Sequence, residues 1–455
     1  MEREKLGSRL GFILLSAGCA IGCGNVWKFP WMCGQNGGGA FVLFYVIFLI
    51  ILGLPVMVME FSVGRASQAS PAKMHKVLEP EGTKWHYHGI GALIGNFVLM
   101  MFYTSVAGWI LYYFVKSLSG SMVGLSAEEV ETTFGNMMSS PGIMVGFMFI
   151  VVIMGFLIIS WGLQKGLERV TKVMMIGLMV LIIMLVVHSL TLSGAKEGLA
   201  FYLVPDFSKV TGATISGAMN QAFFTLSLGI GSMAIFGSYI NKDRTLLGES
   251  VNVIILDTFV AIMAGLIIFP ACFTYNVEVG AGPSLLFVAM ANVFSGMGGG
   301  RIWGTLFFLF MFFAAMSTVL AVFENIQACV SELTGWSRRK TSLICCAAML
   351  ILSLPCALGF NVLSGVHPFG MENLVILDLE DFIVSNCLLP IGSLLFVLFC
   401  TWKSGWGWDN FRKEANSGKG LLVTDNKIVR GYITYILPLI IIVIFVVGIK
   451  SFFGW

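Results

Sequence analysis

The feature that most constrains this chain is the recurrence of long apolar runs. A run of roughly 20 apolar residues crosses the ~30 Å hydrocarbon core of a bilayer as one helix, and about eleven such runs follow one another here. They cover residues 10–35, 39–63, 88–118, 142–161, 167–190, 213–239, 250–275, 301–332, 342–360, 374–402 and 429–452. With 57% hydrophobic and 11% charged residues, a soluble fold would lack a polar coat. The sequence predicts an all-α integral membrane protein with one membrane domain over residues 1–455.

Basic residues set the predicted orientation, because short loops rich in Lys and Arg stay in the cytoplasm. Such residues precede the first run and follow the second, fourth, eighth and tenth: Arg3, Lys5, Arg9, Lys73, Lys76, Lys84, Lys165, Arg169, Lys172, Arg338, Arg339, Lys340, Lys403, Arg412, Lys413 and Lys419. We therefore expect a cytoplasmic N-terminus and, with an odd number of spans, Trp455 on the outer side. The net charge of +3 is small and scattered, which gives no reason to expect a nucleic-acid partner.

The reactive residues form none of the patterns expected of an enzyme or a redox protein. The ten cysteines contain no CxxC pair and lie mostly in or beside apolar runs, where a thiol acts as a small hydrophobic side chain. The five histidines form no HExxH motif, and no GxSxG occurs. We expect no organic cofactor, and a membrane-embedded enzyme is the least favoured interpretation.

Two runs carry glycine clusters at mid-membrane depth. The first contains AGCAIGCGNVWKFP with Gly18, Gly22 and Gly24, and the sixth contains QAFFTLSLGIGS with Gly229 and Gly231. Glycine loosens a helix, and unwound backbone in a membrane is tolerated only inside protein or along a wet cavity. Freed carbonyls are hard oxygen ligands for cations, and such paired breaks indicate a transporter binding site. The alternative is close helix packing through small residues.

The spacing of the two broken runs predicts an internal repeat. The sixth run lies five runs after the first, which fits two five-span units of inverted topology. We expect the first repeat at about 10–190, the second at about 213–402 and one extra span at about 429–452.

Several polar residues lie inside the apolar runs, where a charge is costly unless it is paired or functional. Asp257 in the seventh run is favoured as part of an ion site, whereas Glu60 and Glu324 are favoured as structural braces. Ser317 and Thr318 are adjacent hydroxyls in the eighth run, and on spacing alone they bond to carbonyls of their own helix. Asp378 and Glu380 lie near the outer start of the tenth run, where simple solvation by water is the alternative to a functional role.

These residues together resemble the neurotransmitter:sodium symporter family over nearly the whole chain. The resemblance is carried by SRLGFILLSAGCAIGCGNVWKFPWMCGQNGGGAF, FFTLSLGIG, GPSLLFV, FFAAMST and LDLEDFIVSNCLLPIG. It implies a sodium-coupled amino-acid symporter with a LeuT-like fold, in which spans one and six are unwound. The absence of a twelfth span resembles the shorter bacterial members, which implies the bacterial cytoplasmic (inner) membrane.

The resemblance implies two sodium sites. The first would use the Ala20 carbonyl, Asn25, Thr225 and Asp257 together with the substrate carboxylate. The second would use the carbonyls of Gly18, Ile21 and Ala314 with the hydroxyls of Ser317 and Thr318, which replaces the reading from spacing alone.

The family resemblance also implies where substrate binds. Gly22 stands where monoamine carriers of the family have an aspartate, so the substrate is expected to bring its own carboxylate, as an α-amino acid does. Tyr103 and the amides near Gly24 would bind that carboxylate. The remaining substrate positions are Ala20, Leu99, Phe224, Thr225, Ser227, Ile230, Thr318 and Val322. Most of them are apolar, so we predict a hydrophobic or aromatic side chain.

Three further features follow from the resemblance. Lys28 and Asp381 match the outer gate, and Arg3 and Glu332 match the inner gate, although Leu6 replaces the usual tryptophan there. Members that depend on chloride bind it beside the first sodium, near the positions of Tyr45 and Gln221. Here the negative charge of Asp257 would replace the chloride ion. Ala261, one helical turn later, has no charge and cannot replace it. Some bacterial relatives unwind span five with a glycine and a later proline. Here the glycine is present as Gly166, but Ile176 stands at the position of the proline.

An alternative function remains on the same scaffold. A sodium-gated or amino-acid-gated sensor or channel would bind the same ligands without accumulating the amino acid. The sequence leaves the particular amino acid, the sodium stoichiometry and the oligomeric state open.

Overall fold

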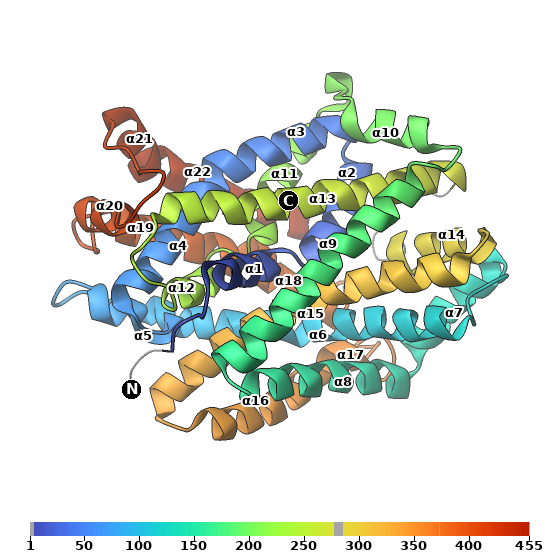
Figure 1. Ribbon diagram of the computed structural model, residues 1–455, viewed down its shortest axis with the longest axis horizontal. Coiled ribbons are helices and arrows are strands. Elements are labelled where there is room, and N and C mark those ends of the chain that lie inside the picture. Colours follow the sequence, from blue (N-terminus) through green and yellow to red (C-terminus); the bar gives the residue numbers. More distant parts are fainter. Residues whose placement is uncertain (1–3, 277–284, 373, 455) are drawn as a thin grey trace.

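The computed structural model describes residues 4–276, 285–372 and 374–454, and within them it forms helices and no strand (Figure 1). In that part of the chain, nine helices are long and apolar enough to cross a membrane. A tenth span is a bent pair, Arg9–Ala20 with Gly24–Gln35, whose halves meet at 52°. The expected all-α membrane architecture is confirmed.

The first half of the chain supplies five spans and the first part of the sixth. Its longer helices are α1 (Arg9–Ala20), α2 (Phe29–Gln35), α3 (Gly39–Phe48), α4 (Leu54–Ser67), α5 (Pro71–Leu78), α6 (Tyr87–Ser119), α7 (Ala127–Ser139), α8 (Pro141–Ser160), α9 (Arg169–Ser189), α10 (Ala195–Leu203) and α11 (Gly212–Thr225). Short wide turns of π-helix join some of them: η1 (Gly24–Lys28), η2 (Leu49–Gly53) and η3 (Leu163–Glu168).

The second half completes the bundle. Its helices are α12 (Ser232–Gly237), α13 (Leu246–Thr274), α14 (Ala291–Gly296), α15 (Gly300–Thr334), α16 (Arg338–Leu352), α17 (Leu354–Leu358), α18 (Ile376–Phe382), α19 (Leu389–Thr401), α20 (Trp408–Ala415), α21 (Lys427–Gly431) and α22 (Leu437–Phe453). The π-helical turns η5 (Leu285–Met290), η7 (Ile383–Leu388) and η8 (Tyr432–Ile436) precede α14, α19 and α22.

Both glycine clusters break their helices, as predicted. After α1 the backbone turns extended at Ile21, with ψ 98°, before η1 begins at Gly24. Between α11 and α12 the residues Ser227, Gly229 and Gly231 have φ of 50°, 99° and 74°. These values lie in the left-handed region that glycine adopts without steric cost. Ser227 reaches it with a side chain, so its neighbours must hold it there.

The fifth span begins earlier than the apolar run indicates. The sequence predicts a span over 167–190, but residues 163–168 already form η3, which continues into α9. The chain turns at Gly162, with φ 106°, and Gly166 packs its Cα against the Ile158 carbonyl so closely that a side chain would clash. The hydrophilic connections also hold helices that the apolar pattern did not indicate, namely α5, α7, α10 and α20.

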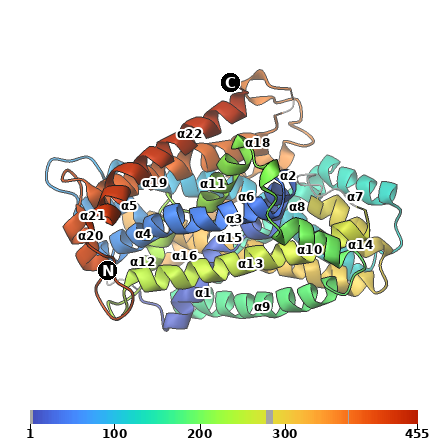
Figure 2. The ribbon, with the colours of Figure 1, turned by 90° about the horizontal axis from the view of Figure 1, so that it is seen from above.

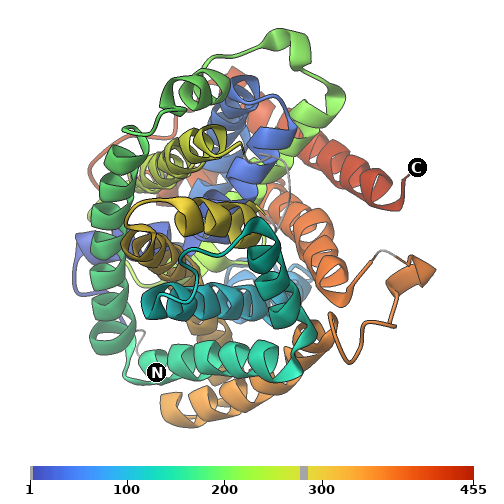
Figure 3. The ribbon, with the colours of Figure 1, turned by 90° about the vertical axis from the view of Figure 1, so that its right-hand side faces the viewer.

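The helices surround α15, which runs through the middle of the bundle (Figures 2 and 3). In the most apolar stretch of α15, 78% of residues are buried, whereas in that of the span that contains α22 only 33% are buried. α15 packs along α6, α9 and α1, and α12 packs against α4. Both broken spans therefore meet long intact helices that hold their ends in place.

The contact between α4 and α12 depends on two glycines. A Cβ added at Gly64 would overlap the Ala234 carbonyl, and one at Gly237 would approach the Phe61 carbonyl at 2.5 Å. Only glycine allows the two backbones to come this close. This contact positions α12 directly after the break in span six.

We predict that Gly64→Ala lowers the stability of the folded protein. Forcing a methyl group into packed backbone costs about 1–3 kcal/mol, whereas Gly146→Ala in α8, where nothing lies within 4 Å of the added Cβ, should be neutral or stabilising. The measurement is the midpoint of thermal unfolding of both variants in detergent. Equal midpoints for the two variants would contradict the close contact.

Candidate functional site

A small internal cavity of about 20 Å³ lies where the two breaks face α6 and α15. Its walls come from α1, η1, α6, the α11–α12 connection, α15 and α19. The lining residues are Cys19, Ala20, Gly22, Gly24, Leu99, Tyr103, Phe224, Ser227, Thr318 and Leu389. Residues more than 350 positions apart in the sequence thus enclose one space.

Oxygen atoms gather around Asp257 on one side of this cavity. The buried Asp257 carboxylate accepts from the Asn25 amide at 2.8 Å and from the Tyr45 hydroxyl at 3.3 Å. The Thr225 hydroxyl lies 3.3 Å from both carboxylate oxygens. The side-chain oxygen Oδ1 of Asn25 accepts from the Gly22 backbone amide at 3.2 Å. The residues Asn25, Thr225 and Asp257, predicted to share a sodium ion, therefore lie together.

A second oxygen cluster joins α1 to α15. The Ser317 hydroxyl donates to the Ala314 carbonyl at 2.9 Å and lies 3.3 Å from the Ile21 carbonyl. The Thr318 hydroxyl lies 3.3 Å from the Gly18 carbonyl and 3.4 Å from that of Ile21. The five oxygen atoms predicted to bind the second sodium thus lie together at the unwound end of α1. Carbonyl and hydroxyl oxygens are the donors that a hard cation takes.

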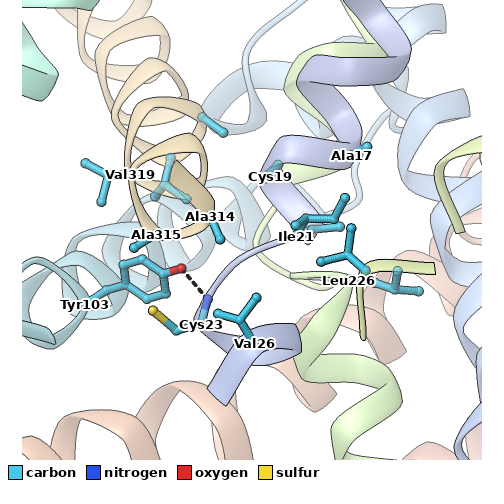
Figure 4. Packing of buried hydrophobic residues seen from close by; sticks show 14 of the residues in the cluster. Ala17, Cys19, Ile21, Cys23, Val26, Tyr103, Leu226, Ala314, Ala315 and Val319 are labelled. Atoms are coloured by element: carbon cyan, nitrogen blue, oxygen red, sulfur yellow. Dashed lines mark hydrogen bonds between the residues drawn. The ribbon is translucent and has the colours of Figure 1, made fainter. Parts of the chain in front are cut away.

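The centre of the cavity is shaped by Gly22. A Cβ at Gly22 would overlap the hydroxyls of both Thr318 and Tyr103. The Tyr103 ring points from α6 toward the extended segment after α1, and its hydroxyl accepts from the Cys23 amide at 2.9 Å (Figure 4). The cavity therefore has a hydroxyl-lined end beside Gly22 and an apolar end near Leu99 and Leu389.

Most predicted substrate positions line the cavity, and a few do not. Ala20, Gly22, Gly24, Leu99, Tyr103, Phe224, Ser227 and Thr318 line it. Thr225, Ile230 and Val322 are buried beside it without forming its wall. Sequence reasoning missed Cys19 and Leu389. The break in span one marked the neighbourhood of Cys19, whereas nothing in the apolar letters around Leu389 indicated that it meets the cavity.

The predicted outer pair is formed. The Lys28 ammonium lies 3.4 Å from an Asp381 carboxylate oxygen and 3.9 Å from the centre of the Phe224 ring. Ser385 donates to the other oxygen of Asp381 at 2.6 Å. Since Phe224 lines the cavity, the pair lies next to the cavity wall, and its role as an outer gate stays a prediction. A second apolar pocket of about 60 Å³ lies beyond Phe224, between Trp27, Trp31 and Leu377.

The predicted inner pair of Arg3 and Glu332 stays a prediction. Arg3 lies outside the described residues, and Glu332 accepts from the Ser70 amide at the start of α5 at 2.7 Å. The ion pair seen at this end joins Arg338 to the buried Glu324.

Arg338 is the centre of a network that ties four segments together. Glu324 in α15 also accepts from the Tyr239 hydroxyl at 2.8 Å, next to α12. Arg338 donates to the Ile159 carbonyl of α8 at 2.8 Å and lies 3.8 Å from Glu4 near the N-terminus. The run of basic residues after the eighth span could have pointed to this role, but nothing in the sequence singles out Arg338 from its neighbours.

Two further carboxylates, Glu60 and Glu380, are buried. Glu60 in α4 accepts from the backbone amides of Gly229 and Met233, the latter at 3.2 Å, which confirms the expected bracing role. Glu380 is buried with 4% exposure, so solvation of this residue was a wrong reading.

An all-helical membrane bundle with two half-broken spans around one central cavity defines a secondary transporter of the LeuT-like fold. The chain belongs to the sodium:neurotransmitter symporter family, whose model matches residues 3–133 and 128–454. This is a family of sodium-dependent membrane transporters.

Individual relatives agree over nearly the full length. The chain is 37% identical to an uncharacterized sodium-dependent transporter of Bacillus subtilis, YhdH, over 98% of both chains. It is 32% identical to an uncharacterized sodium-dependent transporter of Haemophilus influenzae, again over 98% of both. Among solved structures, MhsT in complex with L-phenylalanine matches with a TM-score of 0.88 and 36% identity, covering 98% of this chain and 100% of that one.

We predict that Arg338→Gln strongly destabilises the closed inner end. Removing one partner of a buried ion pair leaves Glu324 uncompensated, which costs about 3–5 kcal/mol. Arg169→Gln is the matched control, because Arg169 is exposed at the same predicted side and should change stability by less than about 0.5 kcal/mol. Thermal unfolding in detergent checks this prediction, and equal effects of the two variants would contradict it.

Proposed function

We propose that the protein is a sodium-coupled symporter that imports a hydrophobic or aromatic L-amino acid by alternating access, without chloride. The observation that carries the proposal is the pair of oxygen clusters beside one cavity, which is lined by hydroxyls and by apolar side chains. Its proposed location is the bacterial cytoplasmic membrane, with the N-terminus inside and Trp455 outside.

Two sodium ions would be coupled to transport in different ways. At the first site, Asp257, Asn25, Thr225 and the Ala20 carbonyl would share the ion with the substrate carboxylate, so that each ligand raises the affinity for the other. At the second, the carbonyls of the unwound end of α1 and the hydroxyls of α15 would be bridged by the ion. Binding there would favour the conformation in which α1 lies against α15.

The substrate proposal combines geometry with the solved relative. Gly22 leaves the space beside the Tyr103 and Thr318 hydroxyls to the ligand, and no basic side chain of the described residues lines the cavity. An α-amino acid carboxylate would lie there, close to the first sodium. The side chain would extend toward Leu99, Phe224 and Leu389. That MhsT binds L-phenylalanine supports an apolar or aromatic side chain.

Asp257 supports independence from chloride. Its carboxylate meets the Tyr45 hydroxyl, and the nearby Gln221 amide donates to the Gly24 carbonyl at 2.7 Å. These are positions that hold the anion in family members that need one, so a fixed negative charge already balances the first sodium here.

Alternating access would open the two closed ends in turn. The Lys28–Asp381 pair with Phe224 would separate toward the outside, and the Arg338 network would separate toward the cytoplasm. We propose that the inverted repeats at about 10–190 and 213–402 make this motion symmetric, with the last span outside them. A membrane potential supplies about 2.3 kcal/mol per charge per 100 mV to sodium entry.

The first test is uptake of labelled amino acids into proteoliposomes that hold the purified protein. With an inward sodium gradient, we expect accumulation of at least one of Phe, Tyr, Trp, Leu and Met, and the same rate when gluconate replaces chloride. Potassium in place of sodium should reduce uptake to the level of empty liposomes. Sodium-dependent binding without accumulation would instead favour a sensor or channel.

We predict that Asp257→Asn makes sodium activation depend on chloride. Asparagine keeps an oxygen ligand but loses the charge. In gluconate, the sodium concentration for half-maximal uptake should therefore rise by about ten-fold or more, which corresponds to roughly 1.4 kcal/mol of binding free energy. Chloride should restore part of this loss, because an anion can again balance the cation. The exposed Asp409→Asn, far from the cavity on α20, is the matched control. An Asp257→Asn protein with unchanged sodium activation in gluconate would contradict the charge-balance argument.

A further inference from the structure

A groove of about 790 Å³ lies between α8 and α16. These two helices lie at one edge of the bundle (Figure 1). η3 closes one end of it. The groove is lined by Ile153, Phe156, Leu157, Ser160, Trp161, Lys165, Arg339, Ser342, Leu343 and Cys346. Its residues have no part in the sites described above.

The walls of the groove are apolar and open to the surroundings of the bundle. Leu157 and Leu343 on its two sides are 53% and 73% exposed. Both belong to helices that cross the membrane, so their exposed surface lies in hydrocarbon rather than in water. An acyl chain can therefore fill the space between them without any cost of dehydration.

The mouth of the groove is positively charged. Lys165 and Arg339 line it, both are exposed, and no Asp or Glu is among the lining residues. Neither cation has an ion-pair partner within the described residues. Trp161 lies beside them at the end of α8 and is 56% exposed, which is the position that amphipathic aromatic rings take at a membrane interface.

We propose that this groove binds one anionic phospholipid from the predicted cytoplasmic leaflet. The phosphate would lie between Lys165 and Arg339, and one acyl chain would follow the apolar walls toward Ile153. Two unpaired cations above an apolar channel match the charge and shape of such a lipid. A zwitterionic lipid would fill the same walls but would leave the two positive charges without a net counter-charge.

The groove also touches the segments that close the inner end. Arg339 follows Arg338, which holds Glu324, and Arg338 donates to the Ile159 carbonyl next to the groove-lining Ser160. The turn after Trp161 leads to Leu163, whose amide donates to Glu4 at 3.2 Å. A bound lipid would brace α8, η3 and α16 against one another and so favour the closed inner end.

The test is native mass spectrometry of the full-length protein in detergent, titrated with phosphatidylglycerol. Each cation near a membrane surface contributes about a five-fold gain in affinity for anionic lipid. We therefore expect one tightly retained lipid in the wild type and about 25-fold weaker retention in the Lys165→Gln, Arg339→Gln double variant. The matched control is Lys76→Gln with Lys403→Gln, which removes two exposed charges from the same predicted side outside the groove.

Trp161 reports whether the acyl chain occupies the groove. Its fluorescence, taken as the difference between wild type and Trp161→Phe, should be quenched more by phosphatidylglycerol with brominated acyl chains than by brominated phosphatidylcholine. This preference should disappear in the Lys165→Gln, Arg339→Gln variant.

Three results would overturn the proposal. Equal lipid loss in both double variants would mean that only general surface charge attracts the lipid. Full competition by inorganic phosphate would mean an anion site without an acyl chain. Ready oxidation of Cys346 to a disulfide between two copies would mean that the groove is an interface between protein chains.

Discussion

The structure depends on how the backbone of its two broken spans is satisfied without water. An unpaired amide or carbonyl in hydrocarbon costs several kcal/mol, so each break needs polar side chains from neighbouring helices. Tyr103 accepts from the Cys23 amide in span one, and Glu60 accepts from the Gly229 and Met233 amides in span six. Asn96 donates to the Ile230 carbonyl at 2.9 Å. Intact helices thus stabilise the broken ones, and the positions of α4 and α6 determine where the breaks can lie.

The same arrangement explains why the binding site consists so largely of backbone. At the end of α1, the carbonyls of Gly18 and Ile21 no longer bond within a helix and lie instead against the hydroxyls of α15. These are weak partners at 3.3 Å, and an ion that offers a stronger interaction can replace them. In the proposed mechanism the break and the second sodium site would be one feature, because unwinding frees the carbonyls that would bind the ion.

Much of this site could be predicted from the sequence, because its signals are local. Glycine clusters at Gly22 and Gly229, and a lone carboxylate at Asp257, are unusual within apolar runs and stand out without a structure. The network around Arg338 could not be predicted in this way. Arg338 is one of three consecutive basic residues, and its bond to Glu324 depends on the angle between α15 and α16. The burial of Glu380 depends likewise on α18 turning inward, which no periodicity in its short polar segment encodes.

Charge balance divides the buried carboxylates of the described residues into two groups, those with an ion pair and those without one. Glu324 is paired with Arg338, Glu414 with Arg65 and Glu168 with Lys172. Glu60 is bonded by amides at the start of α12. Asp257 is surrounded by neutral donors alone, and no ion pair reaches it within the described residues. Burying a charge with neutral partners is costly. Asp257 shares this lack of an ion pair with Glu60 and Glu380, but it differs from them because the polar side chains of Asn25, Tyr45 and Thr225 lie against it. In the proposed mechanism a sodium ion would balance the Asp257 charge only while it is bound, and this would link the affinity of the cavity for substrate to sodium.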